Sequence, residues 1–298
     1  MSVFHSGFAA VVGRPNVGKS TLLNTLIGQK VAIVSAKPQT TRNMIQCIYT
    51  RHDTQIVFLD TPGIHKPRHK LGEYMVQAAR NALKEVDVVA FLSDITQWTA
   101  EDAAILEELV TLDTPVVAVL NKVDLLDPDK VQQAVSQAAA RHAFAAVVPI
   151  SAEHNIDTEI LLAALLEHIP EGPQYYPDDW VVDHPERFIV AEFIREQVLQ
   201  LTEEEIPHSV AVDVDEMKED EKRDKPLMRI RATIYVERDS QKGIIIGKQG
   251  RMLKAIGTGA RQEIETMLGI QVFLDLWVKV KKDWRSKGGT LKEFGYQS

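Results

Sequence analysis

The stretch Gly13-Arg-Pro-Asn-Val-Gly18-Lys19-Ser20 decides the fold of the first half of this chain. It follows an apolar run at residues 8–12 and precedes a segment of helical pattern at residues 21–27, which is the strand–loop–helix context that this spacing requires. Glycines let successive backbone amides turn inward onto phosphate groups, and the N-terminus of the following helix adds positive potential. A tight strand-to-helix turn would explain the glycines but not the Lys-Ser pair. The stretch therefore predicts a nucleotide phosphate site.

Each residue type in this loop suits one task. Lys19 reaches the terminal phosphates, and the Ser20 hydroxyl can ligate Mg²⁺. The nucleotide-binding residues predicted from the loop are Gly13, Asn16, Val17, Gly18, Lys19, Ser20 and Thr21.

Compact apolar runs alternate with helix-length segments over residues 1–172. Runs of this length are typical of strands that are buried on both faces, and their alternation with helices predicts an α/β fold with a doubly wound, mostly parallel sheet. The runs lie at residues 8–12, 56–59, 86–92, 116–120 and 147–150.

Three further motifs each follow one of these runs, at the sheet edge where open α/β sheets bind ligands. Asp60-Thr-Pro-Gly63 offers a carboxylate for the metal and a glycine amide for the terminal phosphate. In Asn121-Lys-Val-Asp124, Asp124 can accept from the N1 and N2 hydrogens of guanine, a pair that adenine lacks, while the Lys122 stem lies along the base. Ser151-Ala152 adds a backbone amide for guanine O6. Each motif is weak alone, but their joint order predicts GTP or GDP with Mg²⁺ as the ligand.

A second domain follows a proline-containing linker at residues 173–186 and spans residues 187–298. Its pattern predicts a small α+β domain with the element order α-β-β-α-α-β. The elements are a helix at residues 188–201, strands at 209–214 and 228–236, an apolar segment at 243–246, a helix at 251–268 and a strand at 272–280.

Gly247-Lys248-Gln249-Gly250 stands between the last two helical segments of that domain. Such a turn lets a nucleic-acid backbone approach closely, and Lys248 supplies charge. Although the whole chain has a net charge of −8, residues 240–298 hold 11 basic against 5 acidic residues. We interpret the turn as a site for single-stranded RNA; the alternative is a helix hairpin with two convenient glycines. Lys281 and Arg285 are further candidates for RNA contact, and a solvated strand end explains them equally well.

Both halves resemble known families. The first resembles the translation-factor-related GTPases, and the second resembles a prokaryotic-type KH domain. Lys37-Pro-Gln-Thr-Thr-Arg42 and the stretch from Gly63 to Tyr74 are similar to the two switch segments of the Era family, bacterial GTPases of small-subunit ribosome assembly. The similarity covers nearly the whole chain, including Lys281-Lys-Asp-Trp-Arg285.

The resemblance implies a set of roles. Thr41, in preference to Thr40, would be the switch threonine that closes on Mg²⁺ with Ser20 and Asp60, and Lys19, Thr41 and Gly63 would be the catalytic residues. The chain would bind the 3′ region of 16S ribosomal RNA on the small ribosomal subunit and act in 30S assembly and rRNA processing. Asn16 matches the asparagine of potassium-stimulated relatives, so K⁺ is a further candidate.

Ile64 occupies the position where many small GTPases carry a water-orienting glutamine. An isoleucine side chain has no hydrogen-bonding group with which to polarise water. We therefore expect slow intrinsic GTP hydrolysis that a bound partner accelerates.

Two other function classes remain open at this point. One is a non-enzymatic scaffold that holds guanine nucleotide as a structural ligand. The other is a membrane-surface GTPase whose basic C-terminal domain faces anionic lipid. The single cysteine, Cys47, excludes an internal disulfide, and no apolar run approaches the roughly 18 residues of a membrane span. We expect a monomer in the cytoplasm, with a peripheral position on the inner face of the cell membrane as the alternative.

Overall fold

The computed structural model describes residues 3–35, 37, 40–62, 69–220 and 226–296 of the 298-residue chain. The chain forms two compact units. The first comprises Met1–Ala32, Thr41–Pro67 and Met75–Asp183. The second comprises His184–Ser298 together with two short segments, Ile33–Thr40 and Arg68–Tyr74. The first segment overlaps one of the two stretches that resemble switch segments, and the second lies within the other. Both belong to the residues that the sequence assigns to the first domain.

The first unit is built on a six-stranded sheet with the order β2-β3-β1-β4-β5-β6. All neighbouring pairs are parallel except β2 and β3, which are antiparallel. The sheet is therefore mostly parallel, and the predicted fold class is confirmed. The strands are β1 (His5–Val12), β2 (Ile45–Arg51), β3 (Thr54–Asp60), β4 (Val88–Asp94), β5 (Val116–Asn121) and β6 (Ala146–Ile150).

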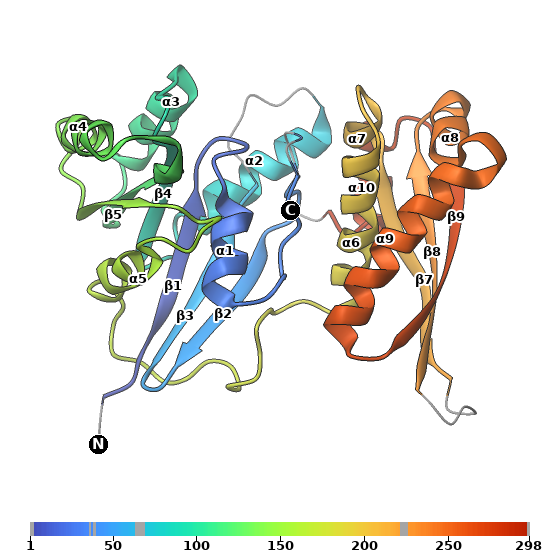
Figure 1. Ribbon diagram of the computed structural model, residues 1–298, viewed down its shortest axis with the longest axis horizontal. Coiled ribbons are helices and arrows are strands. Elements are labelled where there is room, and N and C mark those ends of the chain that lie inside the picture. Colours follow the sequence, from blue (N-terminus) through green and yellow to red (C-terminus); the bar gives the residue numbers. More distant parts are fainter. Residues whose placement is uncertain (1–2, 36, 38–39, 63–68, 221–225, 297–298) are drawn as a thin grey trace. The chain divides into compact units, whose positions relative to one another are not determined.

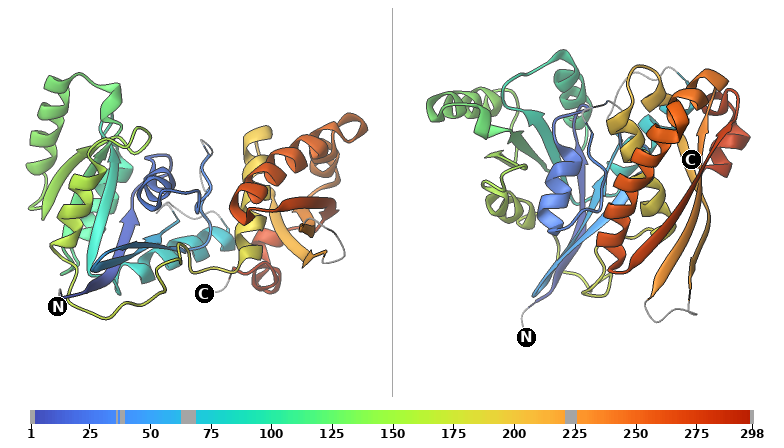
Figure 2. Two further views of the ribbon diagram at one scale, coloured as in Figure 1. Left: turned by 60° about the horizontal axis from the view of Figure 1, so that its bottom comes forward. Right: turned by 45° about the vertical axis from the view of Figure 1, so that its right-hand side comes forward.

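Helices cover both faces of this sheet (Figures 1 and 2). On one face, Ala82, Ile105 and Leu109 pack against strand residues such as Val57 and Val89. On the other face, α1 contacts β2 and β3, and α5 contacts β5 and β6. A strand sandwiched in this way is buried throughout, which is why the strands read as continuous apolar runs. The helices are α1 (Lys19–Ile27), α2 (Lys70–Ala82), α3 (Ala100–Leu109), α4 (Pro128–Ala139) and α5 (Thr158–Leu166), with a short turn η1 (Val123–Leu125).

The second unit has a three-stranded sheet with the order β7-β8-β9, antiparallel between β7 and β8 and parallel between β8 and β9. Helices α6, α8 and α9 contact these strands (Figure 1). The elements are α6 (Glu186–Leu201), α7 (Ile206–Ser209), β7 (Ala211–Glu219), β8 (Leu227–Val236), α8 (Asp239–Ile246), η2 (Lys248–Gly250), α9 (Arg251–Leu268), β9 (Gln271–Val280), η3 (Trp284–Ser286) and α10 (Gly288–Glu293).

In β8, buried apolar residues alternate with exposed arginines as far as Ala232, after which Thr233 is buried as well. Ile230, Ala232 and Ile234 are buried, whereas Arg229 and Arg231 alternate with them and are exposed. One strand face therefore belongs to the core of this unit.

The chain continues into a last short helix after β9. Gly288 and Gly289 form the first turn of α10. Trp284 is fully buried, donates from Nε1 to the carbonyl of Ser209 at 2.8 Å, and stacks on Tyr296. This aromatic packing holds a helix whose first two residues are poor helix formers.

Among the residues that the structure describes, no helix combines the length and the apolar character that crossing a membrane requires.

Candidate functional site

The phosphate loop has the backbone conformation that its glycines allow. Gly18 has φ +103°, and a Cβ there would lie 2.3 Å from the Nδ2 atom of Asn121. A Cβ on Gly13 would lie 2.2 Å from the carbonyl oxygen of Leu92. Any side chain at either position would collide with its neighbours, so the predicted tight turn needs glycine at both ends.

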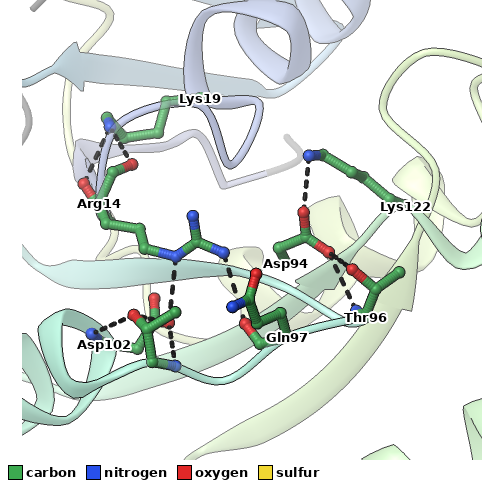
Figure 3. A network of polar contacts seen from close by, with 9 residues as sticks. Arg14, Lys19, Asp94, Thr96, Gln97, Asp102 and Lys122 are labelled. Atoms are coloured by element: carbon green, nitrogen blue, oxygen red, sulfur yellow. Dashed lines mark hydrogen bonds and ion pairs between the residues drawn. The ribbon is translucent and has the colours of Figure 1, made fainter. Parts of the chain in front are cut away.

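Lys19 is buried at the start of α1. Its Nζ atom donates to two carbonyl oxygens of the loop, those of Gly13 at 2.9 Å and Arg14 at 3.1 Å (Figure 3). The amine thus lies inside the loop that the sequence predicts to hold phosphate groups.

Three oxygen-bearing side chains converge beside Lys19. The Ser20 Oγ and Thr41 Oγ1 atoms are 3.2 Å apart, and they lie 3.1 Å and 3.2 Å from Asp60 Oδ2. They come from the start of α1, the segment before β2 and the end of β3. Two hydroxyls and a carboxylate form a donor set that suits Mg²⁺, so these residues fit the metal. Of the predicted switch threonines, it is Thr41 that lies in this cluster.

The side chain of Asn121 joins two of the motifs. Its Nδ2 atom donates to the carbonyl of Val17 at 2.8 Å, and its Oδ1 atom accepts from the amide of Ala152 at 2.9 Å. Asn121 is 3% exposed, so both hydrogen bonds are protected from water. The structure therefore gives Asn121 a positioning task between the phosphate loop and the Ser151-Ala152 motif.

Asp124 lies in η1, directly after β5, with a carboxylate oxygen 3.8 Å from Nε2 of His154. The residue before this turn, Lys122, has a left-handed backbone with φ +74°. Its Nζ atom donates to Asp94 at 2.6 Å. Ser151 is fully buried and accepts from the amide of His154 at 3.3 Å. The sheet topology thus brings the guanine motif and the Ser-Ala motif to one edge, as predicted for parallel strands.

The other residues that the sequence analysis named are placed as follows. Asn16 has a left-handed backbone with φ +66°, and its role as a K⁺ ligand stays a prediction. Val17 is buried, and Thr21 is half-buried in the first turn of α1. Gly63 and Ile64 lie outside the described residues. Cys47 is a buried residue of β2, and burial raises the pKa of its thiol.

Burial lowers the pKa of Lys19 to about 8; attraction to Asp60 opposes this shift, and the Arg14 cation adds to it. A bound triphosphate favours the protonated amine, so binding above pH 8 must be accompanied by proton uptake. We expect the affinity for GTP to fall by about fivefold between pH 8 and pH 9 through this group, because the protonated fraction of the amine falls by that factor. Calorimetric titrations in two buffers of different ionisation enthalpy measure the proton uptake.

A Lys19→Arg variant is the control for this prediction, because its guanidinium stays charged and the titration of guanine itself is unchanged. Equal proton uptake by both proteins at pH 8.5 would contradict the assignment to Lys19.

The Gly-x-x-Gly turn of the second unit has three left-handed residues within four positions. Gly247, Gln249 and Gly250 have φ values of +70°, +53° and +74°. A Cβ on Gly247 would lie 2.7 Å from that of Met252, whereas Gly250 faces open space. The turn begins directly after α8 and ends at the N-terminus of α9.

A groove of about 390 Å³ begins at this turn and runs between α9 and β9. Its leucines offer an apolar surface to bases, and Lys254 and Arg261 add cations. The lining residues are Gly250, Leu253, Lys254, Gly257, Thr258, Arg261, Leu274 and Leu276. Apart from Gly250, sequence reasoning missed these residues as a site. Their signal was the spacing of residues 250, 254, 257, 258 and 261, which places them on one side of a helix.

Lys281 and Arg285 do not line this groove. Arg285 donates to Glu237 at 2.6 Å, and Lys281 pairs with Glu293 and lies 5.1 Å from the Phe294 ring. Both cations thus have partners within their own domain, while their contact with RNA stays a prediction.

Comparisons with known proteins agree with both halves of this description. A family model described as 50S ribosome-binding GTPase matches residues 8–122, and a KH domain model matches residues 205–285. GTPase Era of Staphylococcus haemolyticus is 51% identical over 99% of this chain and 98% of its own length. This chain belongs to the Era family of GTPases. GTPase Era of Staphylococcus epidermidis is 50% identical over the same shares of the two chains.

Solved Era structures have the same fold. Era in complex with MgGDPNP and nucleotides 1506–1542 of 16S ribosomal RNA superposes with a TM-score of 0.95 at 41% identity, covering 99% of this chain and 100% of that one. A variant of Aquifex aeolicus Era bound to GDP and AlF4⁻ superposes with a TM-score of 0.95 at 40% identity and the same coverage. The predicted family, the predicted GTPase activity and the predicted types of the two domains are therefore confirmed.

Proposed function

We propose that this Era-family GTPase binds single-stranded RNA at the 3′ region of 16S ribosomal RNA and acts as a GTP-controlled switch in 30S subunit assembly and rRNA processing. The relative solved with nucleotides 1506–1542 of that RNA supports the choice of RNA, because it has the same fold over the full chain. The observation that carries the proposal is the groove beside the Gly-x-x-Gly turn. An open, apolar groove with cations at its side suits unstacked bases and excludes the edges of a duplex.

The nucleotide site would drive the switch. Ser20, Thr41 and Asp60 would hold Mg²⁺, which neutralises charge on the terminal phosphates when it is bound. Lys19 would stabilise the charge that develops on the transferred phosphoryl group, and Asp124 would hold guanine. Because Thr41 lies in the metal cluster, its position would depend on the nucleotide and its metal, which is how a γ-phosphate orders a switch segment.

A membrane-surface role is not favoured by the charged side chains near the C-terminus. Lys281 and Arg285 are paired with glutamates of their own domain, which leaves little of their charge for lipid. We propose that the protein acts in the cytoplasm and as a monomer.

The groove assignment is tested by Gly250→Asp. Gly250 lines the groove and a new side chain there meets open space, so an aspartate would place a negative charge where a phosphate must approach. We expect the affinity of the full chain for a labelled single-stranded RNA of the 16S 3′ region to fall by about tenfold or more. Fluorescence anisotropy with the GTP-loaded protein measures this loss, and GTP hydrolysis should be unchanged.

Gly269→Asp is the matched control. Gly269 caps the other end of α9 with a similar φ of +68° and also faces open space, so the backbone strain is comparable but the groove is untouched. If RNA binding weakened equally in both variants, or in neither, the assignment of this groove as the RNA site would be wrong.

A further inference from the structure

The segment from Asp94 to Asp102 reaches both the phosphate loop and the guanine motif (Figure 3). Asp94 is the last residue of β4, and Asp102 lies in the first turn of α3. In the register of the sheet, Asp94 pairs with Asn121, so the segment starts beside the guanine motif. Neither aspartate belongs to a predicted nucleotide-binding motif.

At the guanine end, Asp94 holds Lys122. One carboxylate oxygen accepts from Lys122 Nζ at 2.6 Å, and the other accepts from the backbone amide and the hydroxyl of Thr96, at 3.0 Å and 2.6 Å. Burial raises the pKa of Asp94, but the hydrogen bonds from Lys122 and Thr96 outweigh it, so the pKa is lowered overall. The ionised carboxylate is thus fixed on one side by its own loop and bonded on the other to the lysine.

At the phosphate end, Asp102 holds Arg14. Asp102 is fully buried, and its Oδ2 atom accepts from the amide and hydroxyl of Thr99, both at 2.8 Å, and from Arg14 Nε at 3.1 Å. The Arg14 guanidinium also donates to the carbonyl of Gln97 at 3.4 Å. The backbone carbonyl of Arg14 in turn accepts from Lys19. The position of the Lys19 amine therefore depends on Arg14, which this segment binds through Asp102 and through the carbonyl of Gln97.

We propose that Asp94 and Asp102 are positioning residues of the nucleotide site: Asp94 aligns the Lys122 stem that lies along guanine, and Asp102 aligns, through Arg14, the loop that carries Lys19. A single segment then sets the two ends of the site relative to one another. The inference rests on GTP binding by this domain and is independent of RNA binding.

The two aspartates act on different parts of the nucleotide: Asp94 on the base, through Lys122, and Asp102 on the terminal phosphates, through Arg14 and Lys19. The base is common to GTP and GDP, so removing Asp94 should weaken both nucleotides equally. Lys19 meets the terminal phosphates, so disturbing Asp102 should weaken GTP more than GDP. A merely structural role would lower protein stability without producing this difference.

The first test replaces Asp94 by alanine in the full chain. We expect the affinities for GTP and GDP to fall by about tenfold each, since a hydrogen bond between charged groups is lost, and kcat at saturating GTP to stay within about twofold. Lys122→Ala and the double variant complete a cycle in which Asp94→Ala has no further effect once Lys122 is absent. Asp94→Asn, which keeps an acceptor oxygen, should recover part of the affinity.

The second test replaces Asp102 by asparagine, which can keep the hydrogen bonds to Thr99 but removes the charge that faces Arg14. We expect the affinity for GTP to fall by about tenfold and that for GDP by about threefold or less. Thr99→Ala is the complementary control: it breaks the helix cap, in which the Thr99 side chain accepts from the Asp102 amide, but keeps the charge that faces Arg14. Its ratio of GTP to GDP affinity should equal that of the unmodified protein.

Two results would overturn the inference. One is an Asp94→Ala effect that persists in full in the Lys122→Ala background. The other is an unchanged ratio of GTP to GDP affinity in Asp102→Asn. A protein that binds GTP normally but fails to bind RNA would refute the proposed RNA function and leave this inference intact.

Discussion

Replacing Asp124 by asparagine should change the preferred nucleotide from GTP to xanthosine triphosphate. The carboxylate can accept both the N1 and N2 hydrogens of guanine, whereas asparagine offers one acceptor and turns an amide donor toward the other hydrogen. Losing two charge-assisted hydrogen bonds costs about 3–6 kcal/mol, so GTP affinity should fall by about a thousandfold. Xanthine carries an oxygen in place of the amino group, so it can accept from the new amide. Competition binding with both nucleotides measures the change.

Asp127→Asn is the control for this experiment. Asp127 lies three residues further along the chain and its side chain is 79% exposed, so the same loss of charge there should leave both affinities within twofold. If Asp124→Asn still preferred GTP, the guanine assignment and the switch built on it would have to be abandoned.

Replacing Lys19 by alanine should reduce GTP hydrolysis by a factor of about a thousand. The amine is buried inside the phosphate loop, where its charge is poorly screened by water and acts strongly on the terminal phosphates. Phosphate release under multiple-turnover conditions measures the loss. The same experiment separates an enzyme from a scaffold that only holds guanine nucleotide, because a scaffold would show no turnover that Lys19 could affect.

Lys84→Ala, which changes an exposed lysine of the same domain, should hydrolyse GTP at the unmodified rate. Hydrolysis by Lys19→Ala within twofold of the unmodified protein would show that the phosphate loop does not have the role assigned to it.

Short sequence patterns predicted much of the fold and of the nucleotide site, because the residues that form each motif are close together in the chain. The loop from Gly13 to Ser20 needs glycine for backbone conformation and lysine for charge, and these needs leave few alternatives. Continuous apolar runs predicted buried parallel strands, and strict alternation predicted β8 with one face in the core. The carboxyl ends of parallel strands meet at one edge of the sheet, so the sequence alone predicts that the motifs lie together.

Three assignments depended on contacts between distant residues. Asn121 belongs to the guanine motif, but its buried amide joins Val17 to Ala152. The sequence suggests that Lys281 and Arg285 are solvated surface charges. In the structure they pair with glutamates that lie 12 and 48 residues away in the chain, respectively. The groove was not predicted because its lining combines five residues of α9 with Leu274 and Leu276 of β9, and only the folded chain brings these together.

Short stretches of sequence were enough to predict the family, the two domain types, the nucleotide and the Gly-x-x-Gly turn that we propose as an RNA site, because each depends on residues that are close in the chain. The packing of strands and helices was needed to show three further things: Thr41 joins Ser20 and Asp60, a groove lined by α9 and β9 begins at the Gly-x-x-Gly turn, and Asp94 and Asp102 bond to Lys122 and Arg14. The physical reason is that a side chain's partner is set by which strands and helices pack together. A pattern of local spacing carries no information about that choice.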